Sequence, residues 1–278
     1  MYQVVKVLNN NGILAQCLDS STEHIFLGKG IGFHKKTGET FEAIPGAKVY
    51  VVKEGMKSED RLSVLNNIDP IYLDISNEIV LAAEAKFGPL DNNILLPLAD
   101  HIAFSIERQK NGLEILNPLN PDIQILFSEE YQVASQAVDI IRKYTGFTIK
   151  EDEIGYITMH IHSALTREHL RKSMSIVLMV ENFINNIETK YHLHIDKDSL
   201  SYNRLLTHIK YMIVRALKKE ALQVDITPYV KSEFNESYTI SEELCQDLGE
   251  DLGCTFKDTE ISYLAIHIER VRESKKYQ

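Results

Sequence analysis

The sequence has few of the residues that cross-link small secreted domains or bind zinc through sulfur. Its 278 residues include only three cysteines, Cys17, Cys245 and Cys254. Their number is odd, they are widely spaced, and no two form a CxxC pair. We therefore expect neither a disulfide framework nor a cysteine zinc site.

Long apolar runs are also missing. No run reaches the ~18 residues that indicate a membrane span. The N-terminal residues 1–11 (MYQVVKVLNNN) lack the layout of a signal peptide. These two absences predict a cytoplasmic protein without membrane insertion.

Net charge argues against a nucleic-acid partner for most of the chain. The 30 Lys and Arg residues are outnumbered by 40 Asp and Glu residues, which gives a net charge of −10. Residues 1–55, however, contain six basic and five acidic side chains, a net of +1, so the remainder carries −11. Net charge therefore does not argue against nucleic-acid binding by residues 1–55, although it does for the rest of the chain.

The N-terminal part of the chain, residues 1–55, has the pattern of a small antiparallel β module. Short β-branched-rich runs lie at 3–8, 13–18, 24–27 and 48–52, separated by the turn-forming segments 9–12 and 28–32. A four-stranded sheet of this size buries little surface, so we expect a dimer to cover one face. Polar residues 58–60 indicate a linker, and helical periodicity begins at about residue 62.

The rest of the chain contains an internal repeat. Residues 95–165 align on residues 202–272 without a gap, and 17 of the 71 pairs are identical, where chance gives roughly 4. The repeat predicts two copies of one all-α helical-bundle domain. We expect domains at 1–56, 62–168 and 171–278.

Each copy retains two histidines at the same spacing, His101 with His160 and His208 with His267. The apolar spacing around them indicates helices, with each imidazole on the flank of the core face. The second helix of the first copy is predicted to begin with a cap formed by Thr148 and Glu151. One histidine here is commonly a polar edge of a core helix, but four retained in register indicate a function. The two of each copy are expected to share a pocket.

Metal binding and catalysis fit these histidines poorly. His160 and His162 are two residues apart, on different sides of a helix, and His162 is replaced by Glu269 in the second copy. His192 and His194 fit one strand face, but further ligands are not apparent. Asp100 before His101 is likewise not retained. No nucleophile motif, phosphate loop or paired carboxylates accompany the histidines, so we predict no enzyme, no metal and no cofactor.

Reversible phosphorylation fits better. Imidazole is nucleophilic near neutral pH, and a phosphoryl group adds about two negative charges. On a helix flank this change favours a different packing. Arg108 and Arg215, seven residues after the first histidine of each copy, are candidate partners of the phosphoryl group, or alternatively solvated helix ends.

These motifs together resemble one known family. Residues 6–11 (KVLNNN) and 28–36 (GKGIGFHKK) closely resemble the co-antiterminator RNA-binding domain of the BglG/SacY family of transcriptional antiterminators. Residues 99–104 (ADHIAF) and 153–164 (EIGYITMHIHSA) resemble the phosphotransferase-system regulation domains that follow it. The likeness covers essentially the whole chain in the family's domain order. The GKGIGF run is more similar to the glucose-type members than to the β-glucoside or sucrose ones.

The resemblance implies that the N-terminal module forms a homodimer that binds a short hairpin, the ribonucleic antiterminator, in a leader mRNA. Holding the hairpin prevents the overlapping terminator from forming. An asparagine can read base edges, glycines allow close approach, an aromatic ring can stack and lysines meet phosphates. Turn geometry is the alternative role of the two glycines, and core packing that of the aromatic ring. The matching contact candidates are Lys6, Asn11, Gly28, Lys29, Gly30 and Phe33.

For the regulation domains the resemblance implies two inputs at the four histidines. A sugar-specific permease phosphorylates the first domain when its sugar is absent, which inactivates the protein. The carrier HPr phosphorylates the second, which activates it. Thr207 replaces the usual Asp before His208, and Glu269-Arg270 replaces His162-Ser163. These departures weigh more against HPr-dependent activation than against permease control, and they predict that the copies receive different signals.

Overall fold

The structure is a computed structural model that describes residues 1–52, 68–113, 116–167, 170–192, 195–220 and 222–274. It forms two compact units. The first comprises residues Met1–Asn120 and Phe127–Leu170, and the second comprises Pro121–Leu126 and Arg171–Gln278. The predicted linker at 58–60 and the predicted helical onset at 62 lie outside the described residues. No helix within the described ranges is long and apolar enough to span a membrane.

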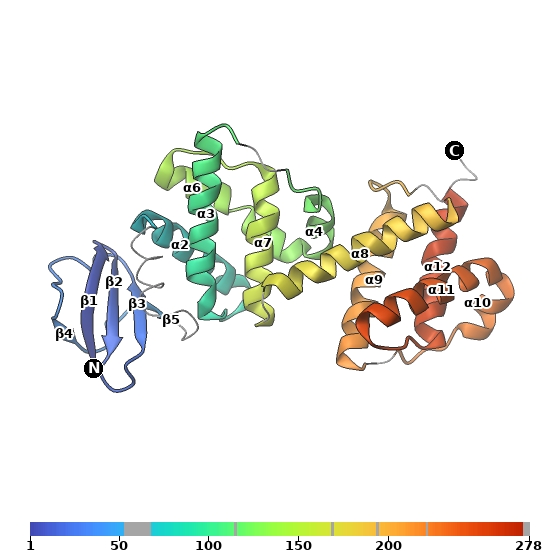
Figure 1. Ribbon diagram of the computed structural model, residues 1–278, viewed down its shortest axis with the longest axis horizontal. Helices are drawn as coiled ribbons and strands as arrows, with labels where there is room; N and C mark the ends of the chain where they lie inside the picture. Colours follow the sequence, from blue (N-terminus) through green and yellow to red (C-terminus); the bar gives the residue numbers. More distant parts are fainter. Residues whose placement is uncertain (53–67, 114–115, 168–169, 193–194, 221, 275–278) are drawn as a thin grey trace. The chain divides into compact units, whose positions relative to one another are not determined.

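An antiparallel sheet forms the N-terminal part of the first unit (Figure 1). The four predicted strands are confirmed, and a fifth, two-residue strand pairs with the first. Sequence periodicity missed this strand because two residues are too few to alternate. The order along the sheet is β4-β1-β2-β3-β5. The strands are β1 (Tyr2–Asn9), β2 (Gly12–Cys17), β3 (Glu23–Leu27), β4 (Thr40–Phe41) and β5 (Lys48–Val52).

Both faces of this sheet are buried in its centre. On one face Val4, Ile13 and Phe26 form a core, with Tyr2 edge-on to Phe26. On the other face Tyr50 is 1% exposed and donates a hydrogen bond to a helix of the same unit. Part of the surface that a sheet of this size must bury is therefore covered by another element of the same chain.

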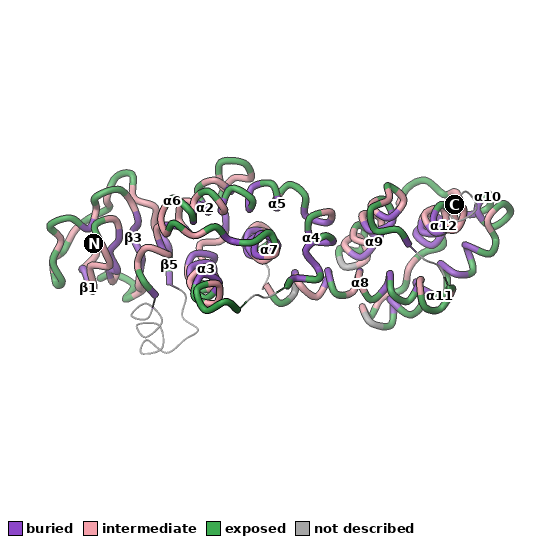
Figure 2. The backbone as a smooth tube through the Cα atoms, turned by 90° about the horizontal axis from the view of Figure 1, so that it is seen from above, coloured by how far each residue is buried: buried purple, intermediate pink, exposed green. Residues whose placement is uncertain are grey.

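The helices of the first unit surround α7, which packs against α2, α3, α5 and α6. Its predicted cap is wrong: the N-cap residue is Lys150, with no side-chain cap hydrogen bond, although three acidic residues do fill the first turn. Buried faces of these helices are purple in Figure 2. The elements are α2 (Pro70–Phe87), η1 (Asn92–Ile94), α3 (Leu95–Lys110), α5 (Ser128–Ala134), α6 (Ala137–Thr145) and α7 (Glu151–Thr166).

The second unit is also helical. In it α12 packs against α9, α10 and α11, and Tyr202 donates a 2.6 Å hydrogen bond to Asp122. Residues 121–126, most of α4, belong to this unit. The elements are α4 (Asn120–Leu126), α8 (Leu170–Tyr191), α9 (Leu200–Lys218), α10 (Thr227–Glu233), α11 (Asn235–Leu252) and α12 (Asp258–Ser274).

Helix boundaries confirm the repeat. The starts of α10 and α12 are separated from those of α4 and α7 by the same offset that aligns the two copies in sequence. Both α6 and α11 end at a C-cap glycine with left-handed backbone, Gly146 (φ 75°) and Gly253 (φ 64°). Since only glycine adopts this conformation without strain, the retained glycine fixes where the following segment begins.

Candidate functional site

The predicted pairing of histidines is found in both copies. In the first, α3 carries His101 and α7 carries His160, and their ring centroids are 5.4 Å apart. In the second, α9 carries His208 and α12 carries His267, with ring centroids 4.8 Å apart. His160 is 9% exposed rather than on a flank, because α7 is packed on several sides.

Three of these imidazoles are uncharged at neutral pH. Burial, together with the neighbouring His101, lowers the pKa of His160 to about 3. Burial, with smaller contributions from the neighbouring His267 and Arg215, lowers the pKa of His208 to about 3. Burial and nearby arginines lower the pKa of His267 to about 4. A neutral imidazole keeps the free nitrogen lone pair that a phosphoryl acceptor needs.

A retained arginine–glutamate pair lies beside each histidine pair. Arg108 donates a 2.8 Å hydrogen bond to Glu153, and Arg215 holds both oxygens of Glu260 at 2.6 and 2.7 Å. The arginines predicted as phosphoryl partners are thus ion-paired within the domain. Sequence reasoning assigned no role to these glutamates, although their retention in the repeat was the available signal.

The two glutamates differ in what else they contact. Oε2 of Glu153 lies 3.1 Å from Nε2 of His101. Burial alone would raise the pKa of Glu153, but His101 and Arg108 outweigh it and the pKa lies below its usual value. Nε2 of His101 and Nε2 of His208 are both buried without a hydrogen bond of good geometry among the described residues, but of the two only His101 is paired with a carboxylate there. The first histidine of each copy therefore has a different electrostatic setting.

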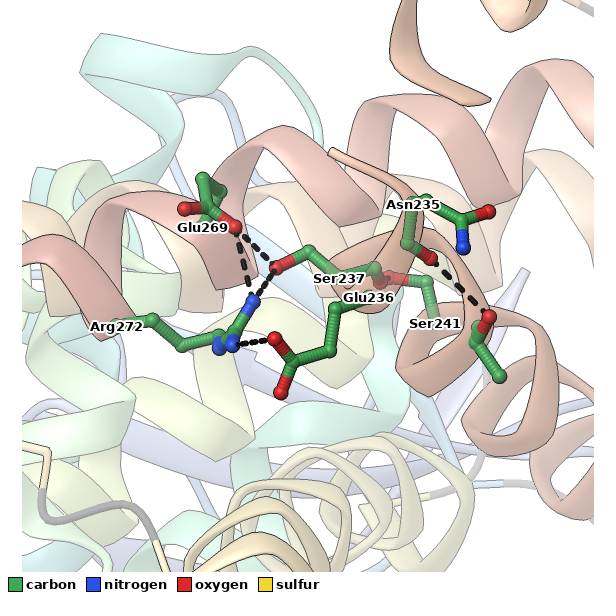
Figure 3. Close-up of polar contacts among 7 residues, drawn as sticks. Asn235, Glu236, Ser237, Ser241, Glu269 and Arg272 are labelled. Atoms are coloured by element: carbon green, nitrogen blue, oxygen red, sulfur yellow. Dashed lines mark hydrogen bonds and ion pairs between the residues drawn. The ribbon is translucent and has the colours of Figure 1, made fainter. Parts of the chain in front are cut away.

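The position where the repeat changes from His162 to Glu269 is a second difference. Nδ1 of His162 lies 2.9 Å from Glu130, and its ring contacts Phe127. In the second copy Ser237 stands where Glu130 stands in the first, and it donates a 2.5 Å hydrogen bond to Glu269 (Figure 3). Arg272 binds the same pair and also Glu236. The carboxylate of this polar pair is therefore on α5 in the first copy but on α12, the counterpart of α7, in the second copy.

Among the described residues, no group of three His, Cys, Asp or Glu side chains is placed to hold a metal ion. The strand interpretation of residues 191–194 is wrong for its first part. Tyr191 ends α8 and His192 follows with φ 52°. Residues 193 and 194 lie outside the described ranges.

Apart from Lys6, the RNA-contact candidates of the β module lie on two adjoining turn segments. The backbone N–H of Gly28 donates to the carbonyl of Asn11 at 2.9 Å, and that of Gly30 donates to the Asn11 side-chain oxygen at 3.0 Å. Gly30 has φ 74°, so turn geometry does require this glycine. A Cβ on Gly28 would lie 3.3 Å from the Ile31 side chain and 3.4 Å from the Ala47 backbone. Gly28 does not have a left-handed backbone, so close packing and not turn geometry restricts this position.

Two further candidates are exposed. The Phe33 side chain is 61% exposed, which excludes core packing, and Lys29, earlier in the same turn segment, is exposed as well. Lys6 is half-buried on β1. Sequence reasoning missed Gly32, where a Cβ would stand 2.1 Å from the carbonyl oxygen of Asn9. Its only signal was its place in the GKGIG run.

The sheet module and the duplicated histidine domain define a class, that of regulators in which an RNA-binding domain precedes two phosphorylation-controlled domains. Family models agree: the CAT RNA binding domain matches residues 2–59, and the PRD domain matches residues 77–164 and 181–271. The chain belongs to this family of transcriptional antiterminators of sugar operons.

Relatives match over nearly their full length. The chain is 32% identical to the PtsGHI operon antiterminator of Bacillus subtilis, over 97% of each chain. It is 28% identical to the Beta-glucoside operon antiterminator of Dickeya chrysanthemi, over 99% of each. The crystal structure of GlcT CAT-PRDI matches with a TM-score of 0.52 and 37% identity, over 59% of this chain and 98% of the other.

Proposed function

We propose that this chain acts as a homodimer that binds an antiterminator hairpin in a leader mRNA and is switched by phosphorylation of His101, His160, His208 and His267. The observation that carries the switch is the contact of two imidazoles within each regulation domain, at 5.4 and 4.8 Å between ring centroids. A phosphoryl group on one ring places about two negative charges against the other. Such a change disfavours the present packing and selects another.

The RNA-binding residues proposed are those of the two adjoining turns and the neighbouring strand. Phe33 is exposed and able to stack on an unpaired base. Lys6 and Lys29 supply positive charge for phosphates, and the glycines would allow the RNA backbone to approach. The full set is Lys6, Asn11, Gly28, Lys29, Gly30 and Phe33.

Different inputs to the two domains follow from their different chemistry. We assign the first domain (62–168) to a sugar-specific permease and the second (171–278) to HPr, with residues 1–56 as the RNA-binding domain. A carboxylate, that of Glu153, lies beside His101, whereas the neighbouring side chains that shift the pKa of His208 are His267 and Arg215. The protein is proposed to work in the cytoplasm, where transcripts and phosphocarriers are found, and to catalyse no reaction.

An electrophoretic shift of leader RNAs by the full chain tests this function. We expect binding to a hairpin of ~30 nucleotides, with affinity that falls steeply as salt is raised. His101→Asp, which mimics inactivating phosphorylation, is expected to weaken the shift, and His208→Asp to preserve or strengthen it. Binding to duplex DNA without binding to any such hairpin contradicts the proposal.

A further inference from the structure

The turn that carries the RNA-contact candidate Asn11 is already occupied in this structure. Nδ2 of Asn9 donates a 2.8 Å hydrogen bond to Oδ2 of Asp74, and Nδ2 of Asn11 lies 3.5 Å from the same oxygen. Asp74 lies on α2, the first described helix of the regulation domain. Two amide donors of the RNA-binding module therefore converge on one carboxylate of the regulation domain.

This contact continues along one side of α2. Tyr50 donates a 2.7 Å hydrogen bond to Asn77, and Lys48 holds both oxygens of Glu84 at 2.6 and 2.7 Å. Positions 77 and 84 lie three and ten positions after Asp74 along the helix, so the three share a face. The contacts between the N-terminal module and α2 therefore include polar and charged groups. Water or another acceptor can replace the partners of these groups.

The chemistry of Asn11 makes the contact competitive with RNA. Its side-chain oxygen accepts from Gly30, which leaves Nδ2 as the donor for an outside acceptor. The carboxylate oxygen of Asp74 is a hydrogen-bond acceptor. The phosphate oxygens and base carbonyls of RNA are acceptors too, so they compete with it for the Nδ2 donor of Asn11. An Nδ2 group turned toward Asp74 has only one of its two N–H groups left for RNA. In addition, the charge of Asp74 repels an approaching phosphate backbone.

The geometry points to Asp74 as an internal competitor that closes the Asn9–Asn11 turn against the first regulation domain and must leave it before RNA binds. This inference rests on the proposed RNA-binding function. Because α2 also packs on α3, which carries His101, the same helix links the histidine pair to the RNA-binding turn. Burial raises the pKa of Asp74, with the two asparagine donors partly offsetting it, so the carboxylate gains hydration on opening.

Removal of the competitor provides the test. We expect Asp74→Ala in the full chain to bind a hairpin of ~30 nucleotides, copied from the leader of the operon named for the Bacillus subtilis relative, about tenfold more tightly than the wild type, within the usual range of coupling between sites. Glu78→Ala is the matched control. Glu78 lies one turn further on α2 and pairs with Lys143, so this variant loses the same charge without touching the RNA-binding module.

The outcomes separate the two proposals. Asp74→Ala binding no more tightly than Glu78→Ala overturns the internal competitor while RNA binding stands. No shift of the hairpin by the wild type or either variant overturns the RNA function and the competitor with it. If Asp74→Ala proves unfolded by circular dichroism, Asp74→Asn, which keeps the size and loses the charge, is expected to tighten binding in the same direction. An Asn variant with wild-type affinity then overturns the competitor.

Discussion

Glu153 holds two groups at once, the imidazole of His101 and the guanidinium of Arg108. Glu260, its counterpart in the repeat, holds two nitrogens of Arg215. A phosphoryl group on His101 would therefore form beside a carboxylate, whereas one on His208 would form beside an arginine whose charge already bears on that imidazole. At the residue scale the two histidine pairs differ in this contact with a carboxylate, which affects the electrostatic cost of phosphorylation.

Replacing this carboxylate is expected to ease phosphorylation of His101. With phosphoramidate as a chemical donor, Glu153→Gln should increase labelling of His101 about tenfold, which corresponds to ~1.4 kcal/mol of relieved repulsion. Labelled histidines are counted by mass spectrometry of the full chain. Glu260→Gln is the matched control and should leave His208 labelling within a few fold. Unchanged labelling of His101 would show that Glu153 does not influence the site.

The buried histidines predict how stability depends on pH. Their pKa values are lowered in the folded chain, to about 3 for His160 and His208 and about 4 for His267, whereas an unfolded histidine has a pKa of about 6.5. Below about pH 6.5 the unfolded chain takes up protons that the folded chain does not. Their contribution to stability is therefore complete above that pH and is lost as the pH falls toward 4.

Urea denaturation at several pH values between 7.5 and 5 checks this. Each buried histidine should add up to about 1.4 kcal/mol per pH unit to the loss of unfolding free energy. His160→Gln should reduce the slope by one such step. Equal slopes for wild type and His160→Gln would contradict the burial of a neutral imidazole.

At the scale of elements, the two turns of the β module are locked to each other. The N–H of Gly32 donates to the carbonyl of Asn10 at 3.0 Å, and no space is left for a side chain at this glycine. The obstacles include backbone oxygens of Asn9 and Gly12. These oxygens move only if the hairpin between β1 and β2 moves, so the geometry of the turns proposed to bind RNA depends on the absence of a Cβ at Gly32.

Gly32→Ala is accordingly expected to lower the free energy of unfolding of the module by about 1–3 kcal/mol and to weaken hairpin binding. Gly38→Asn is the control. Gly38 has φ 87° but open space around it, and asparagine tolerates left-handed backbone, so this change should cost less than about 1 kcal/mol. Thermal unfolding followed by circular dichroism measures both. A Gly32→Ala variant as stable as Gly38→Asn would mean that the turns separate easily.

Helix pairing was retained between the copies while the side chains that join the helices changed. Glu130 on α5 pairs with His162 on α7, and in the same register Ser237 on α11 pairs with Glu269 on α12. The carboxylate exchanged sides, and Arg272 joined the second pair. One helix geometry thus supports two polar chemistries, which fits domains that receive different signals.

At the scale of the whole molecule, charge is divided between parts. A net of +1 over residues 1–55 and −11 over the remainder confines attraction to RNA to the N-terminal module. The acidic remainder contributes Asp74 to the RNA-binding turn of that module. The negative charge of Asp74 at this turn opposes the RNA that the module is proposed to bind.

Several features were predictable because they depend on local periodicity or on the repeat. The four longer strands, the paired histidines and the duplicated helices follow from apolar spacing and from identities such as Gly146 with Gly253. The cap at Thr148 failed because Lys150, in extended backbone, begins the helix instead. Strand β4 was missed because its pairing with β1 is set by partners far along the chain.

The sequence by itself determined the order of domains, the positions of the four histidines and the asymmetry between the copies, because each is a matter of residue identity and register. Only the tertiary structure decided what Glu153 and Asp74 contact. Asp74 lies far from Asn9 along the chain, and no local pattern encodes a pairing at that distance. Tertiary packing also decided that His160 is buried and neutral. The number of helices around α7 depends on this packing and not on the spacing of apolar residues within α7.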